Sequence, residues 1–146
     1  LMKPDFDEPL DDFKEYILNA AQSSDTHALI WFINGDTNLS LGAKQAIEAA
    51  DTINFISIAS LWEISIKISL GRLELKVPYL QIFQQIVDNG FEIHPITFED
   101  TFVLSTLPFY HRDPFDRLII TQAMNNKLTL LSKDEHFIFY KIPLLW

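Results

Sequence analysis

The stretch INFISIASLWEISIKISL, residues 53–70, decides the fold. Its first part, residues 53–58, is dominated by β-branched and aromatic side chains and predicts a buried strand. Ser60 can cap a helix that continues to Leu70, and Gly71 is well placed to end it. A continuously apolar strand that leads directly into a helix is typical of a parallel sheet covered by helices on both faces.

The same alternation of helices and short strands extends along the chain on both sides of this stretch. The pattern predicts further helices over residues 28–33, 41–50, 79–88, 98–106 and 114–126, and a helical turn over residues 134–139. It predicts further strands over residues 91–96, 128–131 and 142–145. In a sheet of this kind ligands bind beyond the carboxyl ends of the strands, so chemically useful residues are sought there.

Composition limits the class of protein. The chain has 146 residues, of which 48% are apolar and 21% charged, and it contains no cysteine. This composition is globular, and it excludes a disulfide scaffold, a thiolate nucleophile, a zinc ribbon and an iron–sulfur site. No apolar run reaches the roughly 18 residues that a membrane span needs, and the acidic start does not resemble a signal peptide. These features predict a cytoplasmic protein without a membrane segment.

The charge is unevenly distributed, and this defines a boundary. The net charge of −9 argues against binding of nucleic acid through a simple basic patch. Residues 1–24 hold six acids and two lysines, whereas residues 25–146 hold fourteen acids and nine bases. Residues 19–24 are small and polar, so we predict a boundary at about residues 20–24. Residues 1–24 then form an acidic tail and junction, and residues 25–146 form the main domain.

Acidic residues recur at predicted helix starts that follow strands. They are Asp25, Glu63, Asp113, Asp116 and Asp134. The helix dipole explains any one of them, but their meeting at one edge of a sheet would require a compensating positive charge. Divalent cations supply it, and an all-oxygen site suits magnesium or manganese. Asp116 lies in an apolar helix and needs a partner, for which Arg117 and a metal are both candidates.

An acid cluster without a nucleophilic cysteine or a Ser-His-Asp pattern favours metal-assisted hydrolysis. Bound cations lower the pKa of a water molecule and stabilise the leaving oxygen of a phosphodiester. A phosphate ester is therefore the favoured substrate class.

Five motifs in order resemble those of PIN-domain ribonucleases, and in particular the VapC-type toxins of bacterial toxin–antitoxin pairs. They are DTHALIW (residues 25–31), SLWEISIK (60–67), GRL (71–73), HRDPFDR (111–117) and LLSKD (130–134), with IPLLW (142–146) at the end. The resemblance implies a PIN-like three-layer α/β/α sandwich around a mainly parallel sheet of about four to five short strands. It also implies an endoribonuclease that depends on Mg²⁺, for which Mn²⁺ may substitute, and a homodimer.

The resemblance assigns roles to individual residues. The catalytic and metal-binding acids would be Asp25, Glu63, Asp116 and Asp134. Asp113 is either an accessory acid or the cap of the helix that starts at Pro114, and both alternatives stay open. Thr26 and Ser132 would orient carboxylates. Arg112, Arg117 and Lys133 would contact RNA phosphates, or are plain surface charges.

The chain departs from the family pattern at its start. The first acid of the family follows an apolar central strand, whereas Asp25 follows residues 19–24, which have poor strand propensity. Either the tertiary context makes this segment a strand or Asp25 is displaced. Residues 3–16 resemble the end of an antitoxin, so the partner would be a cognate antitoxin or this tail itself. Its apolar residues would then fill a groove (Phe6, Leu10, Phe13 and Ile17), although a solvated tail is the simpler alternative.

The histidines and two of the tryptophans lie near the proposed motifs, and the acids are also compatible with other functions. The four histidines, His27, His94, His111 and His136, lack metal-ligand spacing and are expected to be structural, although His27 and His111 flank proposed acids and could instead touch phosphate. Trp31 and Trp62 are predicted to lie in the core rather than to act as base-stacking platforms. The first alternative function is a catalytically disarmed PIN-like module that acts through an antitoxin-type partner. A phosphatase or a DNA nuclease that uses the same acids is a further alternative.

Overall fold

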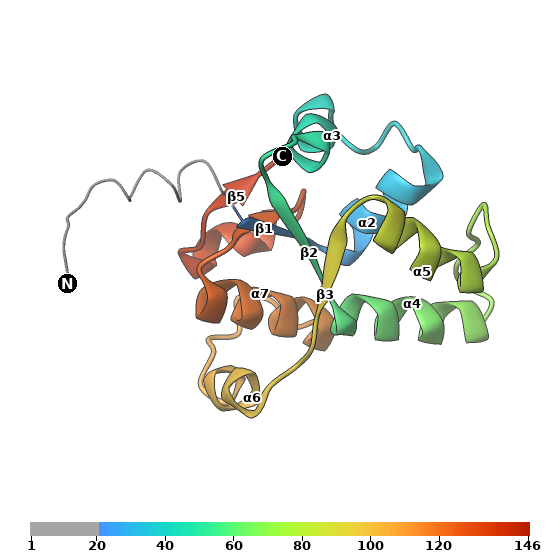
Figure 1. Cartoon of the computed structure of the whole chain (residues 1–146). Coiled ribbons are helices and arrows are strands. Elements are labelled where there is room, and N and C mark those ends of the chain that lie inside the picture. Colours follow the sequence, from blue (N-terminus) through green and yellow to red (C-terminus); the bar gives the residue numbers. More distant parts are fainter. Residues whose placement is uncertain (1–20) are drawn as a thin grey trace.

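The computed structural model describes residues 21–146 as a five-stranded sheet in which all strands are parallel, with the order β3-β2-β1-β4-β5 (Figure 1). The predicted parallel α/β architecture is therefore confirmed. The strands are β1 (Ala21–Ser24), β2 (Ile53–Ser57), β3 (Phe91–His94), β4 (Thr129–Leu131) and β5 (Leu144–Leu145).

Helices cover both faces of this sheet. They are α2 (Thr26–Asn34), α3 (Leu41–Glu48), α4 (Ile58–Ser69), α5 (Tyr79–Asp88), α6 (Phe98–Leu104), α7 (Pro114–Asn126) and the 3₁₀ helix η1 (Glu135–Tyr140). One apolar cluster joins α2, α3, α4 and α5 to the sheet through Ile56 of β2. A second cluster packs α7 and η1 against the sheet, where Leu130 of β4 contributes to it. Side chains alternate between the faces along each strand, so neighbouring residues of one strand serve different clusters.

Strand β1 lies at the centre of the sheet although its sequence, AQSS, is polar. It pairs with β2 on one side and with β4 on the other. Gln22 is buried, and its amide donates to Asn54 Oδ1 at 2.7 Å and to the Ala46 carbonyl at 2.9 Å. The Asn54 amide in turn donates to the Ile47 carbonyl at 2.8 Å. The tertiary context thus makes this segment a strand, and the sheet starts at Ala21, within the interval of residues 20–24 in which the boundary was predicted.

Most predicted elements occur within a few residues of their expected positions, but the start of α4 differs. Ser57, and not Ser60, caps this helix by accepting a hydrogen bond from the Ala59 backbone N–H at 3.0 Å. Ser60 lies inside the helix and accepts a hydrogen bond from Thr26 Oγ1 at 2.9 Å. This contact ties the first turns of α2 and α4 together at the edge of the sheet where both helices begin.

The predictions for the acidic tail, including its apolar residues, concern residues 1–20, which lie outside the described part of the chain. Among residues 21–146, no helix combines the length and the apolar character that crossing a bilayer requires.

The buried amide network gives a first prediction. Replacing Asn54 by Leu leaves a Gln22 donor and the Ile47 carbonyl without a partner in the core, so the free energy of unfolding should fall by about 1–3 kcal/mol. Urea denaturation measures this change. The double variant Gln22→Leu/Asn54→Leu should cost less than the sum of the two single variants, because it removes both polar partners. Strictly additive costs would contradict the coupling.

Candidate active site

Asp25 lies at the carboxyl end of the central strand. It caps α2, and its Oδ1 accepts a hydrogen bond from the Ala28 backbone N–H at 2.8 Å. Its own backbone N–H donates to the Leu131 carbonyl at 3.1 Å, which ties this residue to the end of β4. Only 4% of Asp25 is exposed. The predicted position at a strand end is therefore correct, since β1 delivers Asp25 to the edge where the strand order reverses.

Glu63 projects from α4 in a buried position. Its Oε2 lies 2.9 Å from Lys67 Nζ, one helical turn further along. Its Oε1 is buried and has no hydrogen-bond partner in residues 21–146. A buried carboxylate oxygen without a partner is costly, so this atom is the clearest sign that a ligand belongs beside it.

The start of α7 contributes two acids with different roles. Asp113 is the cap of this helix, and its Oδ1 accepts from the backbone N–H groups of Phe115 at 2.8 Å and Asp116 at 3.1 Å. Of the two alternatives for Asp113, the structure thus shows the cap. Asp116 lies in the first turn, and its Oδ2 is 3.1 Å from His111 Nε2.

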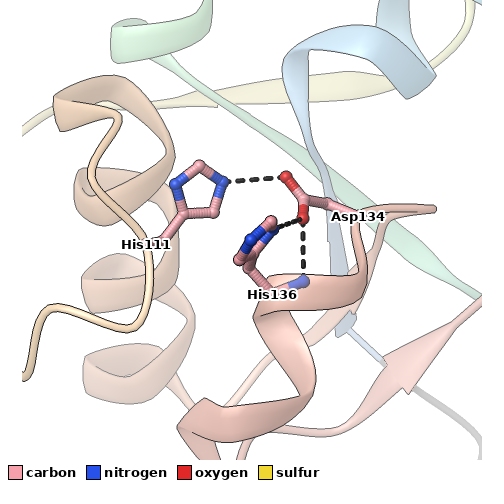
Figure 2. A group of neighbouring side chains, drawn as sticks. All are labelled: His111, Asp134 and His136. Carbon is pink, nitrogen blue, oxygen red and sulfur yellow. Dashed lines mark hydrogen bonds and ion pairs between the residues drawn. The ribbon is translucent and has the colours of Figure 1, made fainter.

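Asp134 caps η1 and is surrounded by two histidines, as Figure 2 shows. Its Oδ1 accepts from the His136 backbone N–H at 2.8 Å and lies 3.0 Å from His136 Nδ1. Its Oδ2 lies 2.8 Å from His111 Nε2. The Nδ1 of His111 accepts a hydrogen bond from the Asp113 backbone N–H at 3.2 Å. In the neutral ring the proton therefore lies on Nε2, which donates it to Asp134 Oδ2, while Asp116 Oδ2 lies 3.1 Å from the same nitrogen.

The electrostatics show that the acids act on one another. Burial raises the pKa of Asp116 to about 8, with further increases from the negative charges of Asp113, Asp25, Glu63 and Asp134. Burial also raises the pKa of Asp25, against hydrogen bonds from Ser132 and Ala28. Carboxylates that raise one another's pKa in this way hold excess negative charge, which a proton or a cation must offset.

Asp134 behaves differently from its neighbours. Burial alone would raise its pKa, but hydrogen bonds from the His136 backbone and from the side chains of His111 and His136 bring it below the ordinary value. Asp134 therefore stays ionised while Asp116 takes up a proton most readily. Pairs of carboxyl groups whose environments push their pKa values apart are typical of functional sites.

The residues predicted to support the acids have mixed outcomes. Ser132 hydrogen-bonds to Asp25 and also accepts from the Asp134 backbone N–H at 3.0 Å, so it does orient both acids. Thr26 instead donates to Ser60 and contacts no carboxylate. Arg112 and Lys133 are exposed, and their contact with RNA stays a prediction.

Both roles predicted for Arg117 are wrong. The side chain is buried, and its guanidinium donates to the carbonyls of Leu107, Pro108 and His111 at 3.0, 2.9 and 3.3 Å. It also covers the ring of Phe109 at 3.8 Å. Arg117 therefore holds the loop before α7 in place. It neither partners Asp116 nor is free to meet phosphate.

Three further residues near the acids were not predicted correctly from sequence. His111 and His136 were expected to be structural, yet both contact Asp134. The position of His111 at the start of HRDPFDR was the available signal, whereas nothing in the sequence marks His136. Trp62 was expected in the core but is 54% exposed, and its ring lies edge-on against Phe115.

The donor set fits a divalent metal ion. Asp25, Glu63, Asp116 and Asp134 offer carboxylate oxygens, which suit magnesium or manganese. The unpartnered Glu63 Oε1 and the raised pKa of Asp116 are the two observations that a cation would resolve. Among residues 21–146, the acids and histidines whose ligand atoms all lie within 4.8 Å of one another are His111, Asp134 and His136, whereas the four acids do not form such a group.

Comparisons with known proteins agree on one family. The model of the PIN domain matches residues 24–143. The chain is 30% identical over 120 residues to Ribonuclease VapC22 of Mycobacterium tuberculosis (strain ATCC 25618 / H37Rv), a match that covers 82% of this chain and 91% of that protein.

Solved structures share the fold. VapBC2 from Rickettsia felis, bound to a DNA fragment from its promoter, has a TM-score of 0.66 at 16% identity, covering 86% of this chain and 97% of that chain. A toxin–antitoxin complex from Klebsiella pneumoniae has a TM-score of 0.60 at 22% identity, covering 86% and 96%. VapBC-5 from Mycobacterium tuberculosis has a TM-score of 0.57 at 14% identity, covering 86% and 98%.

The crowded acids give a second prediction, on stability without metal. Because the pKa of Asp116 rises from 3.8 to about 8 on folding, the folded state binds more protons than the unfolded state between these values. In EDTA, stability should therefore fall as the pH rises through this window. Asp116→Asn cannot ionise, so its thermal midpoint should exceed that of the parent at pH 8.5 and match it near pH 4. Each kcal/mol corresponds to about 2–4 °C in a chain of this size.

The control for this measurement is Asp51→Asn, which removes an exposed carboxylate just before β2, at the end of the sheet opposite the site. It should leave the midpoint close to the parent at both pH values. An Asp116→Asn midpoint at or below that of the parent at pH 8.5 would show that Asp116 is not under electrostatic strain.

Proposed function

The chain belongs to the PIN-domain family and is of the VapC type, and from this premise we propose that it is a Mg²⁺-dependent endoribonuclease, the toxin of a toxin–antitoxin pair. The observation that carries the proposal is the excess of negative charge around Asp116, together with the unpartnered Glu63 Oε1. A structural cluster of caps would not need a buried oxygen without a partner. A cation site does.

The four acids would hold the metal, and each is oriented by a contact of its own. Lys67 fixes one oxygen of Glu63 and leaves the other free. Ser132 holds Asp25, and His111 draws Asp134 and Asp116 toward each other. When bound, Mg²⁺ activates water and neutralises the charge that develops on the phosphodiester, and Mn²⁺ substitutes for it.

The alternative of a disarmed binding module was motivated by the polar segment before Asp25 and by the acidic tail. The first motivation is gone, because β1 is the central strand and Asp25 is buried within electrostatic reach of Asp134 and Asp116, while the second concerns residues outside the described part of the chain. Catalysis is therefore the better reading of the site. Comparing the cleavage of RNA and of DNA of the same sequence tests the alternative of a DNA nuclease.

Cleavage gives a third prediction. The full chain should cleave single-stranded RNA when Mg²⁺ or Mn²⁺ is added, and not in EDTA. Glu63→Gln and Asp116→Asn should each lower the rate by roughly 100-fold or more, because each removes a charge that holds the cation. Gel assays on RNA and on DNA of the same sequence measure this. Asp51→Asn, which alters an exposed acid, is the matched control.

Calorimetry separates loss of metal from loss of chemistry. Mg²⁺ binding should weaken in both site variants and stay unchanged in Asp51→Asn. Cleavage by the parent that persists in EDTA, or equal cleavage of DNA and RNA, would contradict the proposal.

The proposed partner is an antitoxin, and the proposed assembly contains a homodimer of the toxin. A small apolar cavity of about 170 Å³ between α4 and α5 is lined by the buried Ile82 and Ile86 and by more exposed side chains, among them Leu61, Tyr79 and Phe83. An amphipathic helix with apolar residues at helical spacing fits such a groove. Both a cognate antitoxin and residues 1–16 of this chain offer that chemistry.

The role of the N-terminal segment gives a fourth prediction. If residues 1–16 inhibit the site, a chain without them should cleave RNA faster than the full chain at equal concentration, and a synthetic peptide of that sequence should restore the slower rate. Rates measured under single-turnover conditions test this directly. Equal rates with and without the segment would leave a separate antitoxin as the partner.

A further inference from the structure

Two tryptophans flank the acid cluster, and the core does not account for either of them fully. Trp62 precedes Glu63 in α4 and is 54% exposed. Its ring meets that of Phe115 edge-on, at 5.0 Å between centroids and an angle of 81°. Phe115 in turn precedes Asp116. Each ring of this pair is thus adjacent in sequence to a proposed metal ligand, and about half of the Trp62 surface remains open to solvent, at 54%.

Trp31 lies on the other flank, in a cavity of about 470 Å³ that reaches the acids. The cavity is lined by Asp25 and Asp134 together with His27, Trp31, Lys133 and His136. The rings of His27 and Trp31 lie 5.5 Å apart, and the Lys133 ammonium lies 5.8 Å from the centre of the Trp31 ring. A cation, an aromatic wall and two carboxylates therefore share one small open cavity.

We propose that Trp62 and Trp31 bind the bases of the RNA strand, with one unpaired base stacked on Trp62 and another in the Trp31 cavity, so that the phosphate between them reaches the acids. This inference rests on the proposed function and deepens it, because it assigns base recognition to two residues of the site. Trp62 and Trp31 are binding residues in this scheme.

The chemistry of the two positions suits a single strand. Aromatic side chains stack on the faces of unpaired bases, and each such contact contributes about 1–3 kcal/mol. In a duplex these faces are hidden by neighbouring bases, so the same side chains discriminate against it. The volume of the Trp31 cavity lies at the lower end of the range for small-ligand pockets, roughly 300–1,000 Å³, which suits a single nucleotide.

Charge complementarity between this acidic protein and RNA is limited to a small region. The chain as a whole is strongly acidic, so affinity from a general positive field is excluded. At the Trp31 cavity, however, Lys133 is exposed and stands next to His136. The single ammonium of Lys133 can contact one phosphate while the base stacks on the Trp31 ring. Stacking then makes the larger contribution to the binding free energy, and the affinity depends only weakly on salt concentration.

The test measures binding of a fluorescently labelled ten-nucleotide RNA by anisotropy, with Mg²⁺ present and in the Asp116→Asn background so that the RNA stays intact. Trp62→Ala should weaken binding roughly 5- to 150-fold. Phe98→Ala, which removes an aromatic ring that is 83% exposed at the start of α6, is the matched control and should bind like the parent. A duplex of the same sequence should bind more weakly than the single strand.

The Trp31 cavity is tested by two variants, because Trp31 also packs against the core and Trp146. Trp31→Leu should weaken binding by a similar factor, provided that circular dichroism shows a folded chain. Lys133→Ala does not touch the core, and it should lower the slope of log affinity against log salt by about 0.7. An unchanged slope together with unchanged affinity would remove the cavity from the proposal.

The outcomes separate this inference from the proposed function. If Trp62→Ala binds the single strand as tightly as Phe98→Ala does, or if the duplex binds as tightly as the single strand, the inference is overturned even though cleavage by the parent persists. If instead Trp62→Ala loses binding while the parent never cleaves RNA with Mg²⁺, the recognition of a single strand stands and the proposed catalysis fails.

Discussion

Repulsion between carboxylates is the constraint on which the rest of this structure depends. Burial raises the pKa of Asp116 to about 8, and the neighbouring negative charges of Asp113, Asp25, Glu63 and Asp134 add to the increase because burial also removes the screening by water. A protein that needed only stability would separate these groups. The contacts around them, from Lys67, Ser132 and His111, offset part of this cost.

The central strand shows how packing overrides local preference. A sequence of Gln and Ser has poor strand propensity, yet β1 sits between β2 and β4 because Gln22 finds its partners in Asn54 and the end of α3. Propensity reasoning has no access to such a network, since its members are 32 residues apart. The position of Asp25 in the site depends on this strand, so a satisfied polar pair in the sheet supports the chemistry at its end.

The sequence predicted the sheet, most helices and the edge where the acids gather, because apolar periodicity and strand ends are local signals. It failed where a side chain's role is decided by distant partners. The sequence suggested a surface cation at Arg117, but the side chain is buried and its guanidinium donates hydrogen bonds to three carbonyls of one loop. Trp62 looked like core because tryptophan usually is, but its position on α4 exposes it. His136 became visible only once η1 placed it beside Asp134.

The structural and the chemical explanations of the acids turn out to be compatible. Asp25, Asp113 and Asp134 all cap helices, and a cap fixes one carboxylate oxygen on backbone N–H groups. Such a bond orients the side chain without neutralising it, so the second oxygen of a capping residue remains available at a defined position. For Asp134 that oxygen faces His111. Capping therefore fixes the orientation of these three acids at helix starts, and their effect on the pKa of Asp116 shows that the helix starts bring them near one another.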